Sequence, residues 1–208
     1  MNGPNDTTLA IDCATEACSV ALFHRGALID ARHRLLGRGH AEHLIPLIAE
    51  LPGRGRAARI VVSLGPGSFT GVRIGIAAAR ALAIAWGAET LGYPTLALVG
   101  AMAAAESAHA TVGVAMNGGH GEWFVQRFAA GGAPLGPHRS LSPQEAVRAL
   151  PDEVIAGTQA EALVTLRGCG TALTMHPDAS RLPLLANANF TAAIAPIYGR
   201  GPDARLPA

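Results

Sequence analysis

The segment Gly65–Gly75, GPGSFTGVRIG, constrains the fold more than any other stretch of the chain. It follows Arg59–Leu64 (RIVVSL), a short run rich in β-branched residues that is typical of a buried strand. It leads into Val72–Trp86, an apolar, alanine-rich run that is too long for a strand and predicts a helix. Because glycine permits tight turns and close backbone approach, the sequence predicts a strand, a glycine turn and a helix in succession.

The same turn has two interpretations. Ser68 or Thr70 can cap the helix, and the unpaired amides and positive dipole end at a helix N-terminus form a ready anion site. Alternatively, the glycines serve packing alone, because glycine-turn matches are frequent in proteins. Spacing alone leaves both interpretations open.

Composition limits the classes of protein. Half of the 208 residues are hydrophobic, which suffices for one large domain or two small ones. Gly, Pro and Arg interrupt the apolar runs, so we expect no membrane span. The N-terminus, MNGPNDTTLA, lacks the basic and apolar regions of a signal peptide, and we therefore expect a cytosolic protein.

The net charge and the types of basic residue exclude further kinds of binding and catalysis. The formal net charge of +1 argues against a large nucleic-acid footprint carried by this chain alone. Every basic side chain other than histidine is an arginine. The absence of lysine from the sequence excludes Schiff-base chemistry and a P-loop lysine.

The three cysteines, Cys13, Cys18 and Cys169, form no CxxC motif, and an odd number in a cytosolic chain indicates free buried thiols. A hairpin turning at Ala14–Ala17 would place Cys13 opposite Cys18. The two cysteines are then either a pair of buried small apolar side chains, which is the interpretation we favour, or a labile disulfide.

The chain opens with two alternating strands, Leu9–Cys13 and Cys18–His24, and a third is expected over Leu28–Arg34. In this register Asp12 and Ser19 share one face. An acid at the tip of a first strand can meet a phosphate or a metal-bound water, or it can form an Asx turn. Local signals do not separate these roles.

Gly39–Leu51 predicts the first helix, with an apolar stripe that includes Leu44, Leu47 and Ile48. His40 and His43 lie three residues apart, a spacing that suits two metal ligands. A capping or interface role fits better, since no third ligand stands nearby. The second helix, Val72 to about Ala88, presents small residues that permit close helix–helix approach. A strand within Glu89–Leu98 and a helix over 96–107 follow.

A second unit begins at Thr111 with the pattern of the first: a strand over Thr111–Asn117, a turn at 118–121 and a strand over 122–128. Asp12 and Asn117 are 117 − 12 = 105 positions apart, which predicts two related halves, residues 1–105 and 106–208. The second half continues with a helix opened by a capping-box-like Ser142-Pro143-Gln144-Glu145, a strand over 153–156 and helices over 159–166 and 177–188. It closes with a terminal strand or an extended segment over 194–200. This alternation predicts an α/β fold with a cleft between two duplicated halves, bordered by the turns after Asp12, Gly65 and Asn117.

Four segments together resemble the TsaB (YeaZ) family. They are LAIDCATEACSVAL at 9–22, HAEHLIPLI at 40–48, GPGSFTGVRIG at 65–75 and the closing PIYGR at 196–200. Gly121-Glu122 also stands before a strand as in that family. The resemblance covers residues 9–100 well and is patchy beyond them. Asn117-Gly118-Gly119 replaces the family's Asp-Ala-Arg-like turn, and Gly199, Pro202 and Arg205 depart from its closing segment.

The resemblance implies an actin-like/Hsp70-like ATPase fold (ASKHA, RNase H-like) of two duplicated subdomains. It implies a part in forming N6-threonylcarbamoyladenosine at position 37 of ANN-decoding tRNAs, as a cytoplasmic partner of a TsaD-like catalytic subunit and a TsaE-like ATPase. ATP and metal are then expected on those partners and no cofactor on this chain, with tRNA contacted only within the complex. A homodimer is an alternative for the isolated chain.

In such proteins the two helices after the first hairpin form the dimerisation surface. The predicted interface residues are therefore His40, His43, Leu44, Leu47, Ile48, Leu51, Val72, Ile74, Gly75, Ala78, Ala79 and Leu82. The candidate cleft residues are Asp12, Thr15, Gly65, Gly67, Ser68, Thr70 and Gly71.

The related TsaD subunit carries a His-x-x-x-His metal pair, and Thr95 and Val99 stand at the corresponding positions here. We therefore expect an accessory subunit without catalytic residues of its own. The alternative is an ATP-dependent phosphotransferase of the same fold that uses Asp12 and the Gly65–Gly71 turn. A metallopeptidase would need paired metal-binding histidines, which this sequence lacks. A free-standing tRNA-binding protein would need more positive charge and more aromatic residues than this sequence has.

Overall fold

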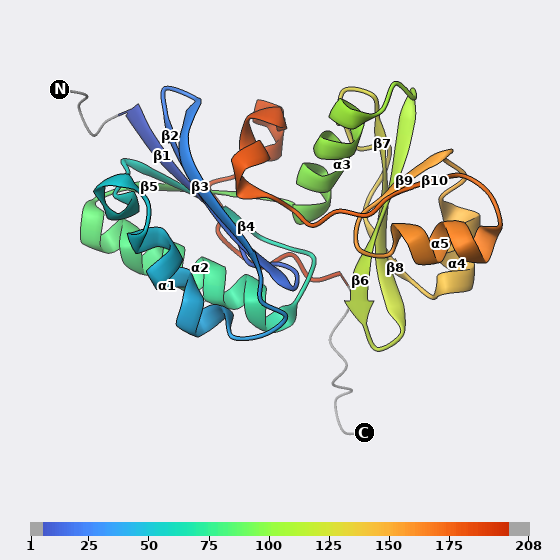
Figure 1. Ribbon diagram of the computed structural model, residues 1–208, viewed down its shortest axis with the longest axis horizontal. Coiled ribbons are helices and arrows are strands. Elements are labelled where there is room, and N and C mark those ends of the chain that lie inside the picture. Colours follow the sequence, from blue (N-terminus) through green and yellow to red (C-terminus); the bar gives the residue numbers. More distant parts are fainter. Residues whose placement is uncertain (1–5, 200–208) are drawn as a thin grey trace.

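Two five-stranded mixed sheets form the protein in the computed structural model, which describes residues 6–199 (Figure 1). The first sheet has the order β3-β2-β1-β4-β5 and the second the order β10-β9-β6-β7-β8. In each, an antiparallel three-stranded meander is extended by two parallel strands on the side of its first strand. The two sheets therefore share one topology, as the repeated sequence pattern predicts. The boundary between residues 105 and 106 stays a prediction.

The bounds of the strands follow. The first sheet comprises β1 (Thr7–Asp12), β2 (Ala17–His24), β3 (Ala27–Leu35), β4 (Arg59–Ser63) and β5 (Glu89–Tyr93). The second comprises β6 (Thr111–Gly119), β7 (Glu122–Ala129), β8 (Arg139–Leu141), β9 (Val154–Ala156) and β10 (Thr171–Leu173). Asp12 pairs with Ser19 across β1 and β2, which confirms the predicted register.

The helices form an outer layer on each sheet and a layer between the sheets (Figure 1). Helices α1 (His40–Ala49) and α2 (Phe69–Trp86) cover the first sheet. Helices α4 (Pro143–Ala149) and α5 (Ala160–Arg167) cover the second, and α4 begins with the capping box at Ser142 that its sequence predicts. Helix α3 (Thr95–Glu106) lies between the sheets.

The strand period of two divides the core. Leu9 and Ile11 point to the outer layer beneath α1 and α2, whereas Ala10 between them points to the inner layer. That inner layer combines residues of both sheets with α3 and a short 3-10 helix, η3 (Ala179–Leu184). The two halves therefore share one hydrophobic core.

The structure corrects three expectations. The predicted helix over 177–188 is wrong, because two short 3-10 helices, η3 and η4 (Asn187–Asn189), stand there with Pro183 inside the first. Helix α2 begins at Phe69, three residues earlier than predicted, because Ser68 caps it. The three-residue strands β8 and β10 are absent from the sequence prediction.

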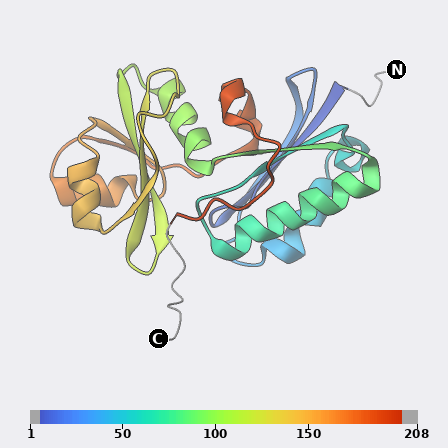
Figure 2. The same ribbon diagram turned by 180° about the vertical axis from the view of Figure 1, so that it is seen from behind.

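The last described residues return to the first sheet. Thr191 bridges Gly92 of β5, and residues 194–199 run on without joining a sheet as a named strand, so the terminal strand that the sequence allowed there is not formed (Figure 2). We call Thr191–Gly199 the C-terminal strap. The predicted closing residue Arg200 lies outside the described residues.

Helix α2 corrects the expectation that no apolar run of the chain is long enough to cross a membrane. By length and composition alone it could cross one. In the structure one face of α2, which includes Val72, Ile76 and Ala79, packs on the first sheet. Its opposite face is exposed, and the site described below depends on that face.

Candidate functional site

The glycine turn and the turn of the first hairpin interlock. A Cβ on Gly67 would lie 2.2 Å from the carbonyl oxygen of Ala14, and a Cβ on Gly71 would lie 2.0 Å from that of Cys13. The Ser68 amide donates to the Ala14 carbonyl at 2.7 Å, and the Ser68 hydroxyl accepts from the Gly71 amide at 3.2 Å. The glycines are thus required by close backbone contact, and the cap that Ser68 provides is confirmed.

A cavity of about 820 Å³ opens beside these turns, between the two halves. Of the candidate cleft residues, Thr15, Gly67 and Ser68 line it. Asp12, Gly65 and Gly71 are buried, and Thr70 is exposed; none of these four lines the cavity. Further lining residues come from both halves and include Glu16, Arg73, Asn117, His120, Thr158 and Tyr198. The predicted border of the cleft by the turns after Asp12, Gly65 and Asn117 is thus confirmed, since residues of all three line the cavity.

Asp12 lies beneath the cavity in a polar network of its own. Its carboxylate accepts hydrogen bonds from the Tyr93 hydroxyl at 2.8 Å and from the Ala14 amide at 2.9 Å, and only 1% of the residue is exposed. Burial raises the pKa of Asp12 to about 6, against the opposing effect of these hydrogen bonds. The Asx turn with Ala14 matches the structural interpretation of this acid. Tyr93, which the sequence analysis did not single out, occupies its second oxygen.

Arg73 connects α2 to the C-terminal strap. Its guanidinium lies 3.3 Å from the ring centroid of Phe69 and 5.3 Å from that of Tyr198, and it donates to the Tyr198 hydroxyl at 2.8 Å. Arginine stacks favourably on aromatic faces. This contact joins residues 125 positions apart in sequence, and no local pattern could have indicated it.

The structure contradicts part of the predicted interface. Eight of the predicted residues are buried in the chain's own core: His40, Leu44, Leu47, Ile48, Leu51, Val72, Gly75 and Ala79. The reason is physical, because the apolar stripe of an amphipathic helix faces its own sheet. Among the remaining predicted residues, His43 is exposed and Ile74, Ala78 and Leu82 are half-buried.

The outward side of these two helices carries exposed apolar side chains beside the exposed polar residues Glu42, His43 and Arg80. Ile84 is 86% exposed and Ile45 is 48% exposed, and they are accompanied by the exposed small residues Ala49, Ala77, Ala81 and Ala85. We call this set, together with half-buried Ala78 and Leu82, the helix-pair surface. It is carried by the predicted helices but by different side chains.

The two histidines of α1 have different surroundings. His40 is buried, and its Nε2 lies 3.3 Å from the Ala17 carbonyl oxygen, which ties α1 to the start of β2. His43 is exposed on the same helix. The capping or interface role expected for His40 is not observed, since the residue is buried and makes a structural contact within the chain.

Comparisons with known proteins agree with this architecture. The family model described as "TsaD: tRNA N6-adenosine threonylcarbamoyltransferase" matches residues 33–153. The Escherichia coli protein "tRNA threonylcarbamoyladenosine biosynthesis protein TsaB" is 43% identical over 93 residues, which are 42% of this chain and 40% of the relative. The match thus spans about two fifths of that relative.

Longer matches cover nearly the whole chain. An uncharacterized protein of Mycobacterium tuberculosis is 29% identical over 207 residues, 96% of this chain and 94% of the relative. The solved structure of YeaZ from Pseudomonas aeruginosa superposes with a TM-score of 0.77 at 28% identity, covering 93% of this chain and 99% of that one.

Two five-stranded mixed sheets of one topology, a shared core and a cleft between the halves place the chain in the α/β class. Nearly complete superposition on YeaZ and the match to the TsaD-related family model identify the group within that class. The chain belongs to this family as one of its TsaB (YeaZ) members.

Proposed function

We propose that this chain is a non-catalytic partner of a TsaD-like subunit in the formation of N6-threonylcarbamoyladenosine on ANN-decoding tRNAs. The names of its relatives and the family model that matches residues 33–153 support this role. ATP and the catalytic metal then reside on the TsaD-like and TsaE-like partners, and the complex assembles in the cytoplasm. Contact with tRNA is made only by the assembled complex, since this chain has a formal net charge of +1.

The observation that carries the proposal is the helix-pair surface. Ile84 is a large apolar side chain at 86% exposure, Ile45 on the packed neighbouring helix is 48% exposed, and exposed apolar patches on a protein mark interaction sites. The alanines beside it allow a second helix to approach closely. A related fold that presents the same two helices would complete a pseudo-symmetric four-helix contact. Because this chain binds one arrangement of the partner's domains more tightly than the others, docking stabilises that arrangement.

The docking is tested with a substitution that leaves the core intact. Ile84→Arg places a charge on the helix-pair surface, and we expect it to weaken binding to the cognate TsaD-like protein at least tenfold, or about 1.4 kcal/mol. The matched control is Leu166→Arg on α5, which is 50% exposed and lies on the other half. We expect the control to bind within twofold of the native chain by calorimetry. Equal affinity of the two variants would remove α2 from the interface.

The role in tRNA modification needs a cellular measurement. Depleting the gene should lower N6-threonylcarbamoyladenosine in tRNA nucleosides measured by mass spectrometry, and the native gene should restore it. Restoration by Leu166→Arg but not by Ile84→Arg would link the modification to the docking surface. Unchanged modified adenosine after depletion would contradict the proposed function itself.

The alternative, a phosphotransferase that uses Asp12, has less support. Its acid does not line the cavity, and its two carboxylate oxygens accept hydrogen bonds from Tyr93 and Ala14. A general base must reach the proton that it removes, and this carboxylate is 1% exposed. ATP turnover by the isolated chain that disappears in Asp12→Asn would revive this alternative.

A further inference from the structure

The two cysteines of the first hairpin lie within reach of one another. Asp12 and Ser19 are the last paired residues of β1 and β2, so Cys13 and Cys18 are the next opposite pair. Their sulfur atoms are 3.6 Å apart, and both residues are at most 1% exposed. Directly opposite residues of an antiparallel pair have Cβ atoms about 4.5–5.5 Å apart, whereas a disulfide needs about 3.5–4.5 Å. A small adjustment of the turn therefore suffices to join them.

We propose that Cys13 and Cys18 form a reversible oxidation site, at which a peroxide converts the two thiols into a disulfide. The site is separate from the helix-pair surface and does not depend on the function proposed above. The cross-link would fix the four-residue turn Ala14–Ala17, of which Ala14, Thr15 and Glu16 line the cavity.

The surroundings assign different roles to the two sulfurs. The contact with the Cys13 thiol lowers the pKa of Cys18, while the same contact and burial raise the pKa of Cys13. Cys18 is accordingly the attacking sulfur and Cys13 the resolving one. Hydrogen peroxide is small, and the turn between the cysteines forms a wall of the cavity, so local opening of this turn gives it a route.

The reaction balances with peroxide as the only oxidant. The Cys18 thiolate attacks one peroxide oxygen, the O–O bond breaks, and hydroxide leaves with the electron pair, giving a sulfenic acid on Cys18. The Cys13 sulfur then attacks the Cys18 sulfur, the S–S bond forms, and water leaves. In this second step the S–O bond of Cys18 breaks and its hydroxyl leaves with the Cys13 proton, while the hydroxide of the first step takes up the Cys18 proton. Two S–H bonds and the O–O bond are lost in all, and the peroxide becomes two molecules of water.

The turn is also in contact with α2. A Cβ on Gly75 would lie 3.9 Å from the Cys13 sulfur, and the Cys13 carbonyl lies under Gly71. Oxidation therefore alters a contact at the base of the helix that carries the helix-pair surface. This contact distinguishes the pair from Cys169, which is exposed and distant in sequence.

The test uses the full chain with Cys169→Ser, which removes the exposed thiol without touching the core. After treatment with hydrogen peroxide and denaturation, we expect both remaining thiols to be lost together and the mass to fall by two hydrogen atoms. Peptide mapping should place the bond between Cys13 and Cys18, and a dithiol reductant should restore both thiols. Adding Cys13→Ala should instead leave Cys18 as an oxygen adduct.

The opposite results are equally clear. Two thiols still titratable after the peroxide treatment, under conditions that oxidise Cys169 in the native chain, would overturn the proposal. A disulfide between chains in place of the internal one would also overturn it. Because the assay needs no partner protein, neither result bears on the docking proposed above. The first measurement requires no substitution in the core, since Cys169→Ser keeps both buried cysteines.

Discussion

At the scale of single residues, Asp12 lies at the position expected of a cleft residue but has a structural role. The acid stands at the end of β1, beside the turn that lines the cavity, yet Tyr93 and the Ala14 amide hold its oxygens. Ser63 and Thr95 extend the buried polar cluster, with their hydroxyl oxygens 2.6 Å apart. Buried polar groups of this kind stabilise one arrangement when each has its partner. The carboxyl group therefore acts as a structural element of the turn.

The titration of Asp12 makes the stability of the chain depend on pH. Burial raises the pKa of Asp12 from 3.8 to about 6, so the folded chain keeps this proton over a range in which the unfolded chain has lost it. The contribution of Asp12 to stability is then fully present below pH 4 and is lost as pH rises to about 6. The loss is roughly 3 kcal/mol, from about 1.4 kcal/mol for each pH unit.

Asp12→Asn removes this dependence, because the amide keeps the shape and can still pair with Tyr93 and Ala14. We expect the free energy of unfolding of the native chain to fall relative to the variant between pH 4 and pH 7, measured with urea. Comparing the two proteins at each pH cancels the other titrating groups. Parallel profiles would show that Asp12 titrates normally.

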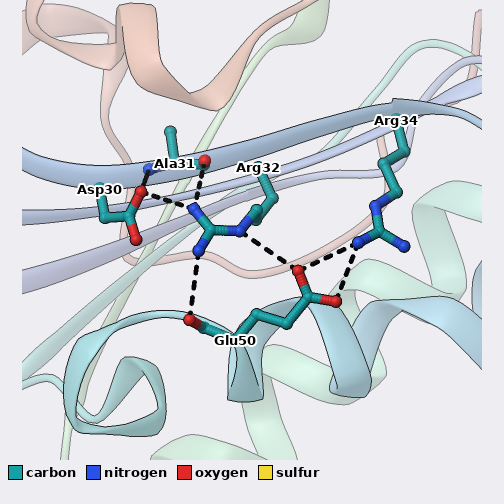
Figure 3. A network of polar contacts seen from close by, with 5 residues as sticks. All are labelled: Asp30, Ala31, Arg32, Arg34 and Glu50. Carbon is teal, nitrogen blue, oxygen red and sulfur yellow. Dashed lines mark hydrogen bonds and ion pairs between the residues drawn. The ribbon is translucent and has the colours of Figure 1, made fainter.

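At the scale of elements, an arginine and glutamate network ties β3 to the end of α1 (Figure 3). Arg32 and Arg34 both donate to the Glu50 carboxylate, at 3.2 and 2.9 Å, and Arg32 also pairs with Asp30. Because β3 is the edge strand of its sheet, charges along it also discourage pairing with other chains. The network fixes the helix-pair surface against the sheet that carries it.

The network predicts a measurable difference between two exposed carboxylates. Glu50→Gln should destabilise the chain by about 0.5–1 kcal/mol at low salt and by less at high salt. Glu89→Gln is the control, since Arg59 is the only ion-pair partner of Glu89 among residues 6–199 and both side chains are about half exposed. We expect the control to change stability by less than about 0.5 kcal/mol, as isolated surface pairs do. Equal effects in urea unfolding would show that the network adds nothing to its pairs.

Most elements could be predicted because their signals are local. The glycine turn with its Ser68 cap, the capping box at Ser142 and the alternation in β1 and β2 each depend on neighbours in sequence. The short strands β8 and β10 could not, because three residues are too few for a periodic signal. The apolar run over 177–188 predicted a helix, but Pro183 and tertiary packing produce 3-10 turns instead.

The site was less predictable for a related reason. A pattern of apolar residues marks the face of a helix that is buried, so it identified Leu44 and Val72, which face the sheet, and missed Ile84, which is exposed. Contacts such as Tyr93 with Asp12 and Arg73 with Tyr198 join positions far apart in sequence. They follow from the assembled fold and not from spacing.

At the scale of the whole molecule, the two halves are held together by the shared core and by the C-terminal strap (Figure 2). The Ile197 amide donates to the Leu64 carbonyl at 2.7 Å, Arg80 donates to the Ile194 carbonyl, and a Cβ on Gly199 would overlap the ring of Phe124 in the second half. The strap therefore contacts the glycine-turn side of the first half and β7 of the second at one edge of the cavity.

This arrangement predicts that one strap residue controls the packing of the cavity wall. Ile197 is half-buried against the outer core of the first half, so Ile197→Asp places a charge in apolar surroundings and should cost about 1–3 kcal/mol of stability. Amide hydrogen exchange should accelerate over residues 191–199 more than in the sheets, because the strap opens locally. Tyr198→Phe is the control, because it removes only the hydrogen bond to Arg73, and Tyr198 is 56% exposed. We expect this control to change the free energy of unfolding by less than about 0.5 kcal/mol. If exchange in Ile197→Asp rises equally in the strap and in both sheets, the strap unfolds only with the whole molecule, and its contacts belong to the shared core.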